Sequence, residues 1–91
     1  MPIAAKTWIV YLVRCRDGTL YTGITVDIVR RIKQHNAGTA SRYTRTRRPV
    51  KLIHDEAHPG QSSALKREWA IKAMSRRQKL ALIRLATKAK R

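Results

Sequence analysis

One stretch of the chain, residues 28–37, places polar groups on the apolar side of a predicted helix. Ile28, Arg31, Ile32 and His35 are three and four residues apart, so a helix aligns them in one stripe. A guanidinium on a core-facing stripe needs a reason to be there, and its planar fork suits two phosphate oxygens. The structural alternatives are an Arg31 that extends past the core to water and a His35 that only caps or packs.

Glu68 occupies a similar position on a second predicted helix. It lies between Leu65 and Ile71 around the helical wheel, at the apolar side. A carboxylate placed there is usually paired or metal-bound. An ion pair with Lys72, one turn further on, is the structural interpretation. The chemical interpretation is a divalent metal site, because Mg²⁺ keeps most of its waters and commonly takes one or two carboxylates plus substrate phosphate.

Tyr11 and Tyr21 lie near the middle of two predicted neighbouring strands. Depending on the register, they share a face and present both hydroxyls to one site, although tyrosines at the rim of a core are also ordinary. A free phenol, with a pKa of about 10, is a poor base unless a metal or Arg31 favours the phenolate. Alternatively, Tyr21 orients a metal-bound water and His35 takes the proton.

Positive charge dominates the composition, with 21 Lys and Arg against 5 Asp and Glu and a formal net charge of +16. A polyanion relieves the self-repulsion of such a domain and releases counterions, so we expect nucleic acid as the partner, DNA above all. An anionic membrane surface is the weaker alternative, and we expect no membrane partner and no small-molecule cofactor. A basic segment with one aromatic ring suits backbone gripping and base stacking. The expected substrate contacts there are Arg42, Tyr43, Thr44, Arg45 and Arg47.

The apolar runs and turn residues predict an α+β fold of order β-β-α-β-α-α, with a small three-stranded antiparallel sheet flanked by helices. Asp17-Gly18 is a hairpin-turn signal, and Asp27 and Gly38 can begin and end the first helix. Gly23 within a strand indicates a bulge or a close approach by another group. We expect strands at 8–15, 20–25 and 50–57, a polar surface loop at 39–48, and helices at 28–37, at 63–74 and from 75 onward.

Capping patterns mark the two later helices. Ser62 or Ser63 can cap the helix at 63–74, and Ser75 with Gln78 forms a capping box for the last helix. We expect residues 88–91 to fray.

The length of the chain predicts one domain over residues 1–91, with its core at about 7–86. Cys15 is the only cysteine, so no intramolecular disulfide can form, and its apolar surroundings predict a buried thiol. The N-terminal stretch lacks the length of a membrane span and the flanks of a secretory signal. We therefore expect a cytoplasmic protein.

Two tripeptides, Ile9-Val10-Tyr11 and Tyr21-Thr22-Gly23, resemble those that name the GIY-YIG nucleases. The segment DIVRRIKQH at 27–35 is similar to the arginine-bearing helix of that family, and ALKREW at 64–69 to its glutamate helix. The resemblance covers essentially the whole chain and is nearest to the small stand-alone bacterial members. Ile9-Val10 departs from Gly-Ile, Thr22 departs from Ile, and no asparagine follows Asn36 where several relatives use one after the glutamate helix.

The resemblance implies an endonuclease that uses Mg²⁺ or Mn²⁺ to hydrolyse phosphodiester bonds in DNA with weak sequence specificity. Water attacks phosphorus while Tyr21, Tyr11 or His35 manages its proton. Arg31 stabilises the phosphorane, and a metal ion on Glu68 assists the leaving oxygen. Thr22 and Gly23 join the expected substrate-binding residues. The rival functions are a non-catalytic nucleic-acid-binding module on the same scaffold and an RNA- or ribosome-associated protein.

Overall fold

Three antiparallel strands form the sheet of a computed structural model that describes residues 7–89. They are β1 (Trp8–Arg14), β2 (Leu20–Thr25) and β3 (Lys51–His58), in the spatial order β2-β1-β3. β1 takes the central place because residues 10–13 are apolar without interruption, and all four side chains are buried. A strand that is covered on both faces has such a continuous apolar run.

The hairpin between β1 and β2 sets the register on which the tyrosines depend. Gly18 adopts a left-handed φ of 85° in the connecting turn, a conformation that glycine adopts without steric cost. Tyr11 then lies opposite Gly23, and Val13 lies opposite Tyr21. Because side chains alternate along a strand, Tyr11 and Tyr21 share one face of the sheet.

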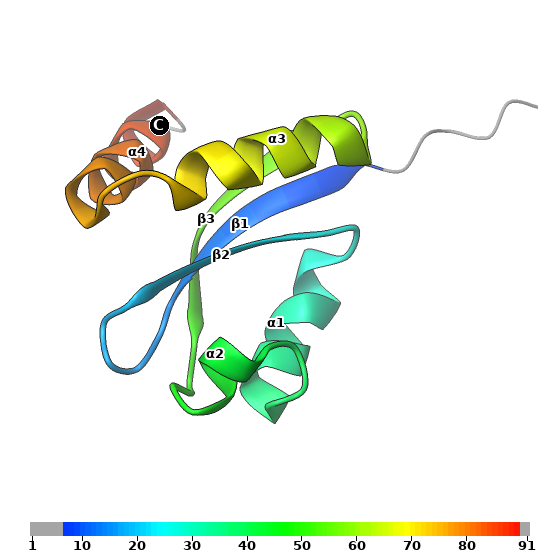
Figure 1. Ribbon diagram of the computed structural model, residues 1–91, viewed down its shortest axis with the longest axis vertical. Helices are drawn as coiled ribbons and strands as arrows, with labels where there is room; N and C mark the ends of the chain where they lie inside the picture. Colours follow the sequence, from blue (N-terminus) through cyan, green and yellow to red (C-terminus); the bar gives the residue numbers. More distant parts are fainter. Residues whose placement is uncertain (1–6, 90–91) are drawn as a thin grey trace, which may run out of the picture.

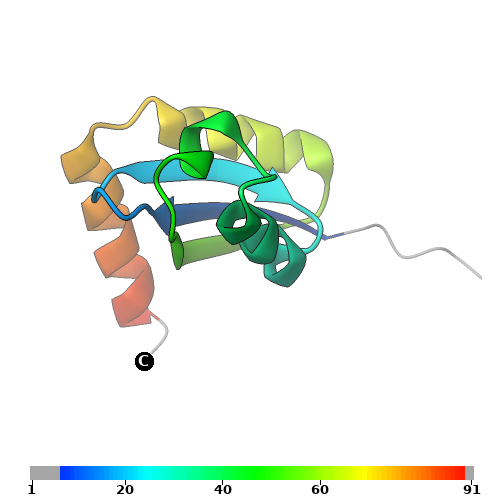
Figure 2. The ribbon, with the colours of Figure 1, turned by 90° about the horizontal axis from the view of Figure 1, so that it is seen from below.

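Helices cover both faces of the sheet (Figures 1 and 2). On one face lie α1 (Ile28–Ala37) and the short α2 (Arg42–Arg45), over a cluster of Tyr11, Val13, Cys15 and Val50. On the other face α3 (Gln61–Lys72) packs Ala64 and Ile71 against Val10 and Leu12. α4 (Arg76–Ala89) follows α3 and contacts β3. The β-β-α-β-α-α order is confirmed, with α2 as an addition.

The caps of α1 and α4 follow the sequence prediction, whereas the start of α3 does not. Asp27 accepts a hydrogen bond from the backbone N–H of Arg30 at 3.0 Å, and Ser75 and Gln78 cap each other reciprocally at 2.8 and 3.2 Å. α3 begins after Gly60, without a side-chain cap. The expectation of a Ser62 or Ser63 cap was therefore wrong.

The segment 39–48 was expected to be a loop without secondary structure, and this was wrong as well. Ser41 accepts the backbone N–H of Thr44 at 3.1 Å and begins α2, whose one turn buries Thr44 completely. At the C-terminus, where fraying was expected from residue 88, α4 continues to Ala89, and residues 90–91 lie outside the described part. No helix between residues 7 and 89 has the length and apolar character needed to cross a bilayer.

Candidate active site

Tyr11 and His35 join the sheet to α1 at the centre of the site. The hydroxyl of Tyr11 and Nε2 of His35 lie 2.8 Å apart. Tyr11 is 1% exposed and His35 is 0% exposed, although a histidine is seldom fully buried without partners. His35 lies on α1 one turn after Arg31, as the stripe predicted, and its ring meets both tyrosines edge-on.

A chain of hydrogen bonds continues from His35 into α2. Nδ1 of His35 lies 2.8 Å from the hydroxyl of Thr44, which lies 2.7 Å from the hydroxyl of Ser41. Both ring nitrogens of His35 thus have a hydroxyl partner, and either neutral tautomer can satisfy the chain by reversing its donors. The partners on both sides fix the orientation of the ring.

Gly23 is the reason that the Tyr11 ring can cross from β1 toward α1. A Cβ atom at Gly23 would lie 2.6 Å from the Tyr11 hydroxyl oxygen and 2.7 Å from Cζ. The prediction that a strand glycine admits a close approach is therefore confirmed, and the approaching group is the partner tyrosine itself. A side chain at this position would displace the phenol from His35.

Tyr21 is more accessible than Tyr11 and stacks on Tyr43 of α2, with ring centroids 5.8 Å apart. The guanidinium carbon of Arg47 lies 3.9 Å from the centroid of the Tyr43 ring, and Arg47 also pairs with Asp17 in the hairpin turn at 3.1 Å. Tyr43 and Arg47 were expected to contact substrate, with Tyr43 stacking a base. The structure places Tyr21 and Arg47 beside that ring, while Tyr43 remains 38% exposed.

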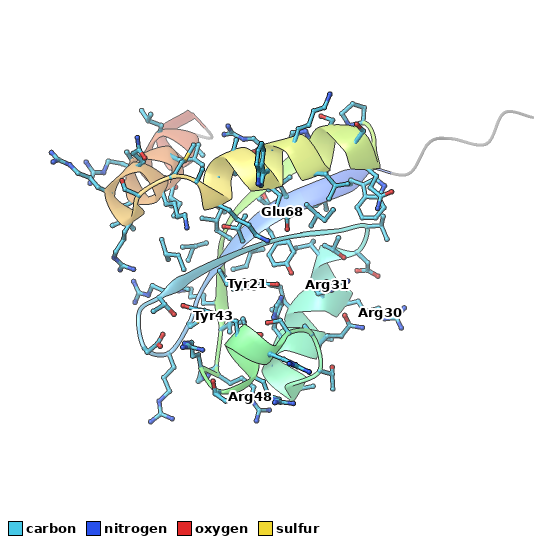
Figure 3. The ribbon with its side chains drawn as sticks, viewed as in Figure 1. Tyr21, Arg30, Arg31, Tyr43, Arg48 and Glu68 are labelled. Atoms are coloured by element: carbon cyan, nitrogen blue, oxygen red, sulfur yellow. The ribbon has the colours of Figure 1, made fainter. Side chains whose placement is uncertain are left out.

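Arg31 and Glu68 approach the tyrosines from opposite layers. Figure 3 shows Glu68 descending from α3 toward Tyr21 and Arg31, while Arg30 points away from the molecule. Nε of Arg31 is buried and has no hydrogen-bond partner among residues 7–89. The carboxylate of Glu68 is 17% exposed and lies 3.4 Å from Nζ of Lys72. The Glu68–Lys72 ion pair, expected as the structural alternative to a metal site, is thus present. The carboxylate also faces the site.

Electrostatic effects connect these groups. Burial, followed by the nearby Tyr21 and Glu68, raises the pKa of Tyr11 to about 12, against an opposing effect of Arg31. Burial and then the charge of Arg31 lower the pKa of His35, so its imidazole is neutral at neutral pH. A neutral imidazole has an unprotonated nitrogen, so it can accept a hydrogen bond from the phenol beside it.

The remaining predicted contacts divide into buried and exposed residues. Thr22 is 3% exposed, and its hydroxyl has no hydrogen-bond partner in the described part of the chain. Gly23 is buried under Tyr11. Thr44 is fully buried and holds His35, so its expected contact with substrate was wrong. Arg42 and Arg45 are exposed on α2, where a nucleic-acid backbone can reach them.

A second polar cluster, which sequence reasoning left without a role, holds α3 against β3. Glu56 accepts two hydrogen bonds from Arg67, at 2.8 and 3.0 Å, and lies within 2.9 Å of Nε2 of His54 and 3.3 Å of Nε2 of His58. Arg67 directly precedes Glu68, so this cluster holds against β3 the turn of α3 that carries the candidate catalytic carboxylate. The signal was present as His-x-Glu-x-His, which places three ionisable groups on one side of a strand.

The chain belongs to the GIY-YIG catalytic domain family, whose model matches residues 7–81. More particularly, it is similar to UPF0213 proteins. It is 51% identical to one from Desulfotalea psychrophila over 89% of this chain and 74% of that protein. It is 52% identical to one from Halobacterium salinarum over 80% of this chain and 95% of that protein.

Two solution NMR structures share the fold. A UPF0213 protein from Bacillus halodurans has a TM-score of 0.58 at 42% identity, covering 87% of this chain and 84% of its own. A protein from E. faecalis has a TM-score of 0.64 at 39% identity, covering 90% and 88%. The family and the α+β architecture expected from the sequence are therefore confirmed.

Proposed function

We propose that this protein is a metal-dependent endonuclease that hydrolyses phosphodiester bonds in nucleic acid, DNA above all, with little sequence specificity. One observation carries the proposal: the buried hydroxyl of Tyr11 lies 2.8 Å from His35, and the Tyr21 phenol, the Arg31 guanidinium and the Glu68 carboxylate, from both layers of the fold, all act on its charge. Family membership supports the nuclease class. The net charge of +16 supports a polyanionic substrate.

Each residue has a role that follows from its exposure. Tyr21 is the more accessible phenol, so we assign it the contact with the attacking water. Tyr11 and His35 are buried behind it and form a donor–acceptor pair that can take up the proton of that water. Arg31 contributes an unpartnered buried N–H beside them, suited to the charge that grows on the phosphate oxygens.

Glu68 is the residue that would hold the metal ion. Within residues 7–89 no three His, Cys, Asp or Glu side chains gather into a metal site. A single carboxylate still fits Mg²⁺ or Mn²⁺, because Mg²⁺ keeps several waters and completes its shell with substrate phosphate. When bound, the ion supplies Lewis-acid stabilisation of phosphate oxygens. Lys72 would have to release the carboxylate, and the 51% exposure of its side chain leaves it free to do so.

The test is nicking of supercoiled and branched DNA with Mg²⁺ or Mn²⁺ by the purified protein. Glu68→Gln and Arg31→Lys should each lose at least about 100-fold in rate, since the first removes the metal ligand and the second the guanidinium fork. Arg30→Lys is the matched control, because Arg30 is the exposed neighbour on α1. Equal nicking by the wild type and both site variants would show that the cleavage comes from a contaminant.

The same Glu68–Lys72 pair favours a second candidate, a nucleic-acid-binding module without catalysis, because Lys72 occupies the carboxylate that acts on Tyr11. That function predicts salt-dependent binding with no metal requirement, unchanged in Glu68→Gln. Affinities for duplex DNA, single strands and RNA, measured over a salt series, separate a DNA protein from an RNA-associated one.

A further inference from the structure

A basic hollow of about 470 Å³ opens beside α2 and away from the tyrosines. Its charged lining residues are Arg16 after β1, Arg45 on α2 and Arg48 after α2, and Asn36, Thr46 and Pro49 complete the wall. None of these residues is acidic. Asp17, the acid next to Arg16, is bonded to Thr19 and Arg47 instead. The hollow therefore holds three guanidinium groups without a carboxylate among its lining residues.

The backbone around the hollow fixes one of the guanidinium groups. Nε of Arg48 donates to the carbonyl of Arg45 at 2.9 Å, and Nη1 donates to the carbonyl of Asn36 at 3.3 Å. A Cβ atom at Gly38 would lie only 2.9 Å from Nη1, so the glycine leaves room for the guanidinium. Because these two hydrogen bonds hold the guanidinium in place, the remaining N–H groups of Arg48 are preorganised for an anion.

Hydrogen bonds also connect the segments that form the wall of the hollow. The side-chain amide of Asn36 donates to the carbonyl of Val50 at 3.2 Å and accepts the Val50 N–H at 2.7 Å. The backbone N–H of Arg16 donates to the carbonyl of Arg47 at 2.9 Å, which ties the hairpin to the segment after α2.

We infer that this hollow binds a phosphate group of the nucleic-acid strand, separate from the phosphate at Arg31. The inference rests on the proposed function for the identity of the partner. In the view of Figure 3, Glu68, Tyr21, Tyr43 and Arg48 follow one another down the molecule, with Arg48 beyond α2. Tyr43 and the lining residue Arg45 both lie on the single turn of α2, so a strand that leaves the tyrosines past Tyr43 arrives at the hollow. Planar guanidinium groups suit the paired non-bridging oxygens of a phosphate.

The test is binding of short oligonucleotides without divalent ions, so that no cleavage occurs. Arg16→Gln and Arg45→Gln should each weaken binding by about 10-fold and reduce the slope of log Kd against log salt by about 0.7 to 0.9, the value for one lost phosphate contact. Arg48 is left intact because it also holds the end of α1. Arg30→Gln is the matched control, since it removes the same charge from an exposed site elsewhere on α1.

Modified strands identify the phosphate. A neutral methylphosphonate is moved along the oligonucleotide, and a 5′-phosphorylated strand is compared with a 5′-hydroxyl strand. Some modifications will weaken binding by the wild type but not by the Arg16→Gln/Arg45→Gln double variant. The phosphate altered by such a modification is the one bound in the hollow. Equal losses from Arg16→Gln, Arg45→Gln and Arg30→Gln, with no position-specific effect, would overturn the inference. Because metal-dependent nicking is measured separately, failure of catalysis leaves this result intact, and the reverse also holds.

Discussion

At the scale of single residues, Gly23 determines whether Tyr11 reaches His35. In Gly23→Ala, the new Cβ would lie 2.6 Å from the Tyr11 hydroxyl, so the phenol must move away. We expect a loss of about 1–3 kcal/mol in the free energy of unfolding, as for other overpacked sites, together with loss of nicking. Denaturant unfolding measures the first effect. Gly60→Ala, where no atom lies within 4 Å of the added Cβ, is the control and should remain active.

Thr44 is the second residue with a decisive contact, because it joins His35 to Ser41. Thr44→Val keeps the shape of the side chain but removes the hydroxyl from a fully buried site. We expect a cost of about 1–3 kcal/mol, since Nδ1 of His35 loses its partner. Nitrogen-15 NMR of the imidazole should also change as its tautomers redistribute. An unchanged imidazole spectrum would contradict an orienting role for Thr44.

At the scale of elements, Glu56 and Arg67 attach α3 to β3. Burial alone would raise the pKa of Glu56, but hydrogen bonds from Arg67, His54 and His58 outweigh it and lower the pKa from its usual 4.5 to about 2. A depressed carboxyl pKa stabilises the fold fully above 4.5, and this contribution disappears as the pH falls toward 2. The loss is at most about 3 kcal/mol.

The measurement for this attachment is unfolding by denaturant over a pH series. The wild type should lose stability between about pH 5 and pH 2. Glu56→Gln should be less stable at neutral pH and should change much less over the same interval. Parallel curves for the two proteins would show that other carboxyl groups control the acid transition.

At the scale of the whole molecule, the net charge of +16 lowers the stability of the folded state through self-repulsion. We expect the thermal midpoint to rise with moderate salt, because screening weakens repulsion over distances of about 10 Å. Nucleic acid added at low salt should raise it as well, because it binds the folded state. Arg30→Glu, which lowers the net charge by two, should show a smaller rise with salt. A midpoint that falls with salt would mean that attractive ion pairs dominate.

Much of the fold could be predicted because local patterns determine it. The hairpin turn, the Asp27 and Gly38 caps and the inward stripe of α1 each depend on residues close in sequence. α2 could not be predicted, because four residues complete one turn and show no periodicity. The burial of Thr44 depends on a contact with His35, nine residues away, and no local signal indicates it. The cluster around Glu56 needed the pairing of β3 with α3, which only the tertiary structure provides.

The exposed Trp69 on α3 is an intrinsic fluorescence probe beside the candidate site. It follows Glu68 in the chain and is 81% exposed, whereas Trp8, the other tryptophan of the chain, is partly buried. An exposed indole emits at longer wavelength and is quenched by dissolved iodide. Its fluorescence therefore reports on α3 beside Glu68 without an attached dye. Titration with Mn²⁺ or DNA can be followed on the unmodified protein, and Trp69→Tyr separates its signal from that of Trp8.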